Sequence, residues 1–192
     1  MRKSLVAVLL ALGATSLSYG DDSAPFDGGH PGGPYDHHVL YAFDSHGKRI
    51  GPVLSLGTID GVILSINGVT TFIPVERVTN SAGQFLASQY EWWSGTYSSI
   101  FPSSDCSGPP IIVGDVLGTL RPSTVIRQGN DATAYIAPDT YSTTITTAMS
   151  LYSSGQCLSG STLPPYITGE GWTPESSYSL TQNYPEPLSI HY

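Results

Sequence analysis

Charged residues are scarce in this chain, at 11% of 192 residues. Lys and Arg number only 7 against 15 Asp and Glu, which gives a net charge of −8. Nucleic acids and anionic membranes are bound through clusters of basic side chains that displace counterions. Because no more than two basic residues adjoin anywhere in the sequence, we expect neither nucleic acid nor an anionic membrane as a partner.

Long apolar runs are also missing. The run Leu5–Leu12 follows Arg2 and Lys3 and precedes small residues that continue to Gly20. This order is typical of a cleaved secretory signal peptide, and the run is shorter than the roughly 20 residues that span a bilayer. We therefore expect cleavage near Gly20 and a secreted or periplasmic protein that is not an integral membrane protein. An uncleaved N-terminal membrane anchor is the alternative.

Cysteine occurs only at Cys106 and Cys157. Two cysteines in an exported chain are expected to form a disulfide bond, and this bond would stabilise the fold by roughly 4 kcal/mol through its effect on the unfolded state. Both cysteines lie in Ser/Gly-rich stretches that offer no neighbouring base. A catalytic thiol or a metal ligand is the alternative for either residue.

Recognisable catalytic and metal-binding motifs are absent as well. The chain has no G-x-S-x-G sequence, and its histidines lie near the two ends, at His30, His37, His38, His46 and His191. The His- and Asp-containing stretch from residue 30 to 46 carries donors for zinc, nickel or copper, but its spacing matches no rigid template. We expect no catalytic residue, no metal and no cofactor.

Carboxylates could nevertheless form a pair that supports glycoside hydrolysis, which needs two of them about 5–10 Å apart. The candidates are Glu91, Asp105, Asp115, Asp131, Asp139, Glu170 and Glu175. Sequence spacing selects none of these over the others. A small secreted hydrolase that uses paired carboxylates is therefore the alternative to a non-catalytic role.

Turn-forming residues are abundant, with 21 Gly and 15 Pro beside many Ser and Thr, and this favours a turn-rich β protein over long helices. The strongest local signal is Gly61–Val75, where Asn67-Gly68 separates two β-branched runs and predicts a type I′ hairpin whose ladder ends at Pro74. The other predicted strands are Val39–Phe43, Arg49–Leu56, Gln84–Trp93, Tyr97–Phe101, Pro110–Val113, Ser123–Gln128 and Ala132–Ala137.

These signals predict a mainly β protein with a single antiparallel β-sandwich or barrel-like domain and one disulfide. Residues 1–20 are the predicted signal peptide, 21–37 a flexible Gly/Pro/His leader, 38–160 the β-rich domain and 161–192 a Pro/Tyr-rich irregular tail. Within the domain, Tyr141–Tyr152 fits both the helical period and the strand period. Its threonines favour the strand, and a helix is the alternative.

Three segments carry a resemblance to a group of known proteins. They are Phe43–Lys48, the apolar Val62–Val75, and Pro102–Pro109 around Cys106. Together they resemble small secreted bacterial proteins of uncharacterised function that are often β-rich. The resemblance implies a secreted, strand-built domain and carries no catalytic residue over to this chain.

Aromatic side chains are the main functional signal. Tyr90, Trp92, Trp93 and Tyr97 lie close together in the sequence, and flat amphipathic rings suit stacking on sugars or on partner proteins. Trp92 and Trp93 must face opposite sides of a strand, so one of them can enter the core while the other meets solvent. We predict a non-catalytic binding or structural protein of the envelope or extracellular space, with a glycan or another such protein as partner and these four residues as its site.

Overall fold

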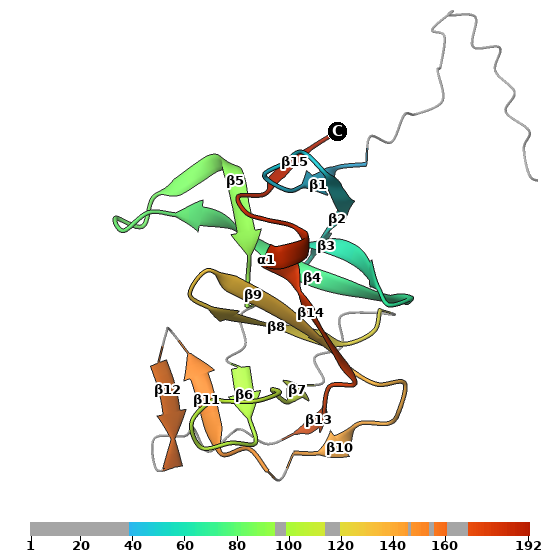
Figure 1. The fold of residues 1–192 in the computed structure, drawn as a ribbon, viewed down its shortest axis with the longest axis vertical. Helices are drawn as coiled ribbons and strands as arrows, with labels where there is room; N and C mark the ends of the chain where they lie inside the picture. The colour runs from blue at the N-terminus through green and yellow to red at the C-terminus, as the bar shows by residue number, and fades with distance from the viewer. Residues whose placement is uncertain (1–38, 95–98, 114–119, 146, 154–155, 161–168) are drawn as a thin grey trace, which may run out of the picture. The chain divides into compact units, whose positions relative to one another are not determined.

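The computed structural model describes residues 39–94, 99–113, 120–145, 147–153, 156–160 and 169–192 (Figure 1). The predicted signal peptide and leader lie outside these ranges. The described chain is built mainly of antiparallel strands and carries one disulfide, which confirms the predicted fold class. Within the described ranges, no helix is long and apolar enough to cross a membrane.

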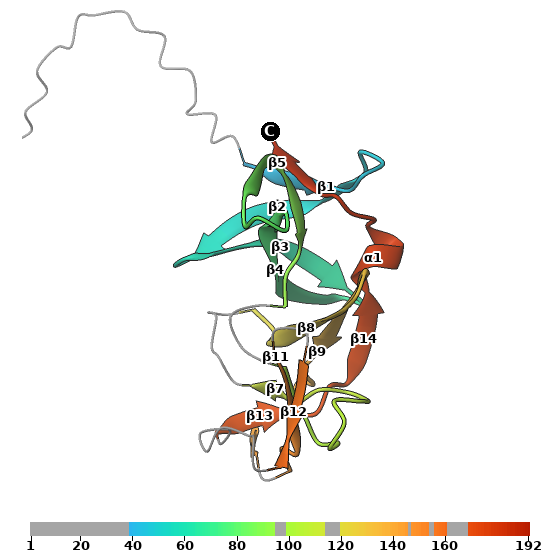
Figure 2. The same cartoon turned by 90° about the vertical axis from the view of Figure 1, so that its left-hand side faces the viewer.

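Six described strands form one antiparallel sheet in the order β15-β1-β2-β3-β4-β5. They are β1 (Tyr41–Phe43), β2 (Arg49–Leu56), β3 (Ile59–Ile66), β4 (Val69–Thr79), β5 (Phe85–Trp92) and β15 (Ser189–His191). The two edges meet where Tyr90 in β5 and Leu188 beside β15 exchange N–H···O hydrogen bonds of 2.9 and 2.8 Å. The sheet is therefore nearly closed into a barrel (Figure 2).

The β3–β4 hairpin confirms the strongest sequence signal. Asn67 and Gly68 have φ values of 52° and 82°, and both residues of a type I′ turn need a positive φ. The β3–β4 ladder ends at the pair Gly61–Pro74, as predicted, although β4 itself continues to Thr79. The Pro74 carbonyl accepts the Trp93 N–H at 3.0 Å, so the missing proline donor lies on the β5 side, where that ladder ends.

Three smaller antiparallel sheets complete the described part of the chain, in the orders β14-β9-β8, β12-β11-β6 and β10-β13-β7. Their strands are β6 (Ser99–Phe101), β7 (Ile112–Val113), β8 (Ser123–Gln128), β9 (Asp131–Ile136), β10 (Thr143–Thr144), β11 (Ser150–Ser153), β12 (Gln156–Ser159), β13 (Glu170–Trp172) and β14 (Ser176–Ser179). The described part of Tyr141–Tyr152 is thus strand and loop, which favours the strand prediction over the helix for this segment.

The main hydrophobic core joins the barrel-like sheet to the β14-β9-β8 sheet. Barrel strands supply inward-facing residues such as Val62, Ile73 and Trp92, and β8 and β9 supply Val125 and Ile136. All of these side chains are shielded from solvent. The alternation of inward and outward side chains along each strand accounts for this arrangement, since one face of each sheet is apolar.

The segment from Gly169 onward is more regular than the irregular tail that composition indicated. It contains β13, β14, β15 and the helix α1 (Leu180–Asn183), and β14 pairs with β9 while β15 pairs with β1. Each element is only three or four residues long, so no period can be read along the sequence. The described strands after residue 160 thus pair with strands that come before it in the chain.

The predicted disulfide between Cys106 and Cys157 is present, with the two Cα atoms 5.9 Å apart. It ties the loop after β6 to β12. Ser150 in β11 is hydrogen-bonded to this loop at two points. Its buried hydroxyl accepts the Cys106 N–H at 3.0 Å and donates to the Ser103 carbonyl at 2.6 Å. The disulfide connects two segments that are 51 positions apart in the sequence.

Candidate functional site

Trp92 belongs to the core and not to a binding surface. Its side chain is 0% exposed, its indole Nε1–H donates to the Tyr184 carbonyl at 3.3 Å, and its ring packs 6.4 Å from that of Tyr184. A ligand cannot stack on a ring that solvent does not reach. This corrects the prediction for Trp92 as a binding residue.

The other three predicted residues do not form a shared aromatic platform among the described residues. Trp93 is half-buried and directly follows Trp92, the last residue of β5. Tyr90 is half-buried, and the Arg77 guanidinium lies over its ring at 4.8 Å from the centroid. Tyr97 lies outside the described residues.

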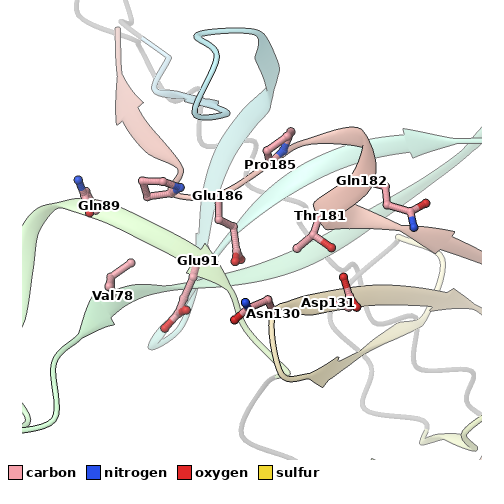
Figure 3. A pocket seen from close by; sticks show the side chains of 10 residues that line it. Val78, Gln89, Glu91, Asn130, Asp131, Thr181, Gln182, Pro185 and Glu186 are labelled. Carbon is pink, nitrogen blue, oxygen red and sulfur yellow. The ribbon is translucent and has the colours of Figure 1, made fainter.

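A cleft of about 580 Å³ opens beside β5, between the barrel-like sheet and the β8–β9 hairpin (Figure 3). Its lining comes from β4, β5, the β8–β9 turn, α1 and the segment that leads to β15. The lining residues are Val78, Gln89, Glu91, Asn130, Asp131, Thr181, Gln182, Pro185, Glu186 and Pro187. Most of them carry carboxylate, amide or hydroxyl groups, and none is basic or aromatic.

The wall formed by the segment after α1 is held in place by several backbone contacts. The Ser45 N–H donates to the Pro185 carbonyl at 2.9 Å, and Leu188 makes its paired hydrogen bonds with Tyr90. The Trp92 N–H donates to Glu186 Oε1 at 2.6 Å. These bonds fix the Glu186 side chain above β5, at the edge of the cleft.

Arg127 in β8 binds two of the carboxylates that line the cleft. Its Nη1 and Nη2 atoms each lie 2.9 Å from an oxygen of Glu186, and Nη2 also lies 3.1 Å from Glu91 Oε2. Since both Oε2 atoms are this close to one nitrogen, they are no more than about 6 Å from each other. The hydrogen bonding that Arg127 donates to Glu186 is the main cause that raises the Arg127 pKa.

Glu76 adds a third carboxylate beside this group. It is the direct cross-strand partner of Glu91 in the β4–β5 ladder, and like charges in that position oppose each other. Partial loss of solvent and, second, repulsion from Glu91 raise the Glu76 pKa, while attraction to Arg127 acts in the other direction. One guanidinium therefore faces three carboxylates and does not neutralise all of them.

Replacing Glu76 with glutamine is expected to raise the free energy of unfolding by about 0.5 kcal/mol at neutral pH. The folded-state pKa of Glu76 is raised above its ordinary value of 4.5, so ionisation of this carboxyl opposes folding. The gain should be present above the folded-state pKa and vanish well below 4.5, where Glu76 is protonated in both states. Thermal unfolding of both proteins at neutral and acidic pH measures it.

The matched control for Glu76 is Asp139→Asn, since the Asp139 side chain is 93% exposed and its contact with Arg121 is 3.5 Å long. That variant should change stability by less than about 0.5 kcal/mol at either pH. A Glu76→Gln gain of equal size at both pH values would contradict the assigned origin of the raised pKa.

The geometry of the cleft suits hydrogen bonding more than proton transfer. Both oxygens of Glu186 already accept hydrogen bonds from Arg127, and Oε1 accepts a further one from the Trp92 backbone. Such a carboxylate is a fixed acceptor and is not free to carry a proton to a ligand. The amides of Gln89, Asn130 and Gln182 add both donors and acceptors around the same opening.

Metal binding finds no support in the described part of the chain, where no group of three or more His, Cys, Asp or Glu side chains is arranged to hold an ion. Most of the His- and Asp-containing stretch between residues 30 and 46 lies outside the described ranges.

Comparison with protein-family models, with curated proteins and with solved structures found no match. The chemistry of the cleft is therefore the basis for the functional proposal.

Sequence reasoning included Glu91 and Asp131 among its candidate carboxylates but missed Arg127 and Glu186. These two residues are separated by 59 positions and meet only because the segment after α1 returns to the edge of β5. No local pattern in the sequence signals that return. The sequence therefore could not predict that the Arg127 guanidinium lies between the carboxylates of Glu91 and Glu186.

Proposed function

We propose that this protein works outside the cytosol as a non-catalytic binding protein, and that a neutral glycan binds in the cleft. The observation that carries the proposal is the Arg127-held pair of carboxylates within an otherwise amide- and hydroxyl-rich lining. Fixed acceptors and amide donors match the hydroxyl groups of sugars, and the cleft has the size of a small-ligand site. The Cys106–Cys157 disulfide supports export, because such bonds persist in oxidising compartments.

The proposal moves the glycan site away from the aromatic cluster that the sequence suggested. Tyr90 and Trp93 lie in or next to β5, whose residues Gln89 and Glu91 line the cleft. Trp92 supports the site from the core, by placing its backbone N–H under Glu186. Stacking on Trp93 would be an addition to the hydrogen bonds of the cleft and not their replacement.

A binding experiment tests the proposal with a panel of neutral oligosaccharides and the full chain. Isothermal titration calorimetry on the best binder should show that Gln89→Ala and Asp131→Asn each weaken binding about tenfold, the effect of losing one or two hydrogen bonds. Both side chains are exposed, so neither change should affect folding. Asp139→Asn is the control for charge, because Asp139 lies outside the lining.

Failure of every neutral oligosaccharide to bind would contradict the proposal. It would also be contradicted if Trp93→Ala abolished binding while the two cleft variants left it unchanged, since this result would place the ligand on the aromatic surface.

A small hydrolase is the second candidate, and one observation favours it. Glu91 and Glu186 approach within about 6 Å in one cleft, which is near the roughly 5–5.5 Å typical of retaining glycosidases. Their shared pairing with Arg127 argues for the binding role instead. Release of a chromogenic leaving group from aryl glycosides, lost in Glu91→Gln, would favour the hydrolase, whereas we expect no release.

A further inference from the structure

Arg49 differs from the other arginines of the described chain. Arg121 and Arg127 form ion pairs with carboxylates, and Arg77 donates to the Leu86 and Ala87 carbonyls in β5. The described residues offer Arg49 no such hydrogen bond or ion pair, and its guanidinium lies over the Tyr41 ring at 3.8 Å from the centroid. Arg49 thus lies over a ring, and no described residue accepts a hydrogen bond from its N–H donors.

The register of the barrel-like sheet places Arg49 in a group of four flat side chains. Tyr41 pairs with His191 and Phe43 pairs with Arg49, and directly paired residues share one face of a sheet. Ala42, between Tyr41 and Phe43, is fully buried in the core. The four side chains therefore lie on the outside of the barrel, and we call them the outer face.

The four side chains stack along the diagonals of the ladder. The Phe43 and His191 rings are parallel to within 1° with centroids 4.0 Å apart, and the Arg49 guanidinium carbon lies 3.8 Å from the centroid of the Tyr41 ring. Arg49 and His191 are exposed, whereas Tyr41 and Phe43 are half-buried. The outer face therefore consists of stacked flat side chains, and the exposed Arg49 contributes its guanidinium.

We propose that the outer face binds the carboxylate of an acidic sugar, such as a uronic acid within a glycan chain. A guanidinium stacked on a ring keeps its N–H edge free, and this planar edge matches the two oxygens of a carboxylate. Aromatic faces pack against the ring of the attached sugar. The site is separate from the cleft and goes beyond the proposed function, because its residues do not line the cleft.

Charge complementarity selects this occupant. The chain as a whole carries a net charge of −8, and Arg49 is a local positive charge without an ion-pair partner among the described residues, which favours an anionic group there. A nucleic acid needs several phosphate contacts, and the outer face supplies a single arginine. A uronic acid carries one carboxylate on its sugar ring. This matches one guanidinium that lies beside aromatic rings.

Short oligogalacturonates are the probe for this proposal, and their methyl esters are the matched neutral ligand. Calorimetry with the full chain should show binding of the acid and not of the ester. Arg49→Gln should weaken binding about tenfold or more, and Arg49→Lys should fail to restore it, because an ammonium lacks the planar pair of donors. Arg49 is exposed, and thermal unfolding confirms that each variant folds.

Lys48→Gln and Arg77→Gln are the control variants. Each removes one positive charge, but Lys48 lies over Tyr184 and Arg77 lies over Tyr90 with its donors engaged. Both should bind the acid within about twofold of the unaltered chain. The proposal is overturned by equal losses in Lys48→Gln and Arg49→Gln, by equal binding of acid and ester, or by no binding of the acid. It is also overturned if Asp131→Asn abolishes binding while Arg49→Gln does not.

Discussion

Replacing Trp92 with alanine is expected to lower the free energy of unfolding by about 3–5 kcal/mol, the range for a large aromatic residue removed from a core. The side chain is 0% exposed and belongs to the main core, which residues of both sheets build. Its loss leaves a cavity and removes the partner of the Tyr184 carbonyl. Urea denaturation followed by circular dichroism measures the change.

Trp93→Ala is the matched control, since it removes the same side chain from the next position. Trp93 is half-buried, and the expected loss is about 1 kcal/mol, close to the average for a point substitution. Losses of similar size in the two variants would contradict the assignment of Trp92 to the core. So would a Trp92→Ala protein that keeps its stability and loses ligand binding.

Removing the disulfide by the double substitution Cys106→Ser and Cys157→Ser is expected to lower stability by about 4 kcal/mol. The two residues are separated by 51 positions, so the bond restricts a long loop in the unfolded chain. Cys106 is also 6% exposed and packs with Phe101 and Ile126, which adds a smaller loss when a hydroxyl replaces the sulfur. Denaturant unfolding of both proteins measures the difference.

Reduction of the unaltered protein separates these two contributions. Added thiol should lower its unfolding midpoint and leave that of the double variant unchanged. A midpoint of the unaltered protein that does not respond to a strong reductant under denaturing conditions would contradict the loop-closure account.

The sequence predicted those parts of the fold that depend on local chemistry. Asn67 and Gly68 determined the hairpin, because the type I′ turn that joins two β-branched strands needs positive φ at both residues. Arg49–Leu56 and Ser123–Gln128 became strands with the predicted bounds. The disulfide followed from two cysteines and a predicted export signal.

The parts that the sequence did not predict depend on contacts between distant segments. The strand Ser189–His191 exists through its pairing with β1, and no pattern within three residues can indicate a partner nearly 150 positions away. The sequence could not tell which of Trp92 and Trp93 is buried, for the same reason. Strand alternation predicts that neighbouring side chains face opposite sides, but it does not predict which side is the core. The contact between Arg127 and Glu186 is likewise a contact between distant segments, because 59 positions separate the two residues.

One nuclear magnetic resonance experiment tests the central proposal most directly, by following the labelled full chain and a neutral oligosaccharide in the same sample. We predict that amide signals of cleft residues such as Gln89, Asp131 and Thr181 shift on addition of the sugar, while the anomeric signals of the sugar keep their number and intensity. Shifts confined to the surroundings of Trp93, or the appearance of new reducing-end signals, would contradict a non-catalytic glycan site in the cleft.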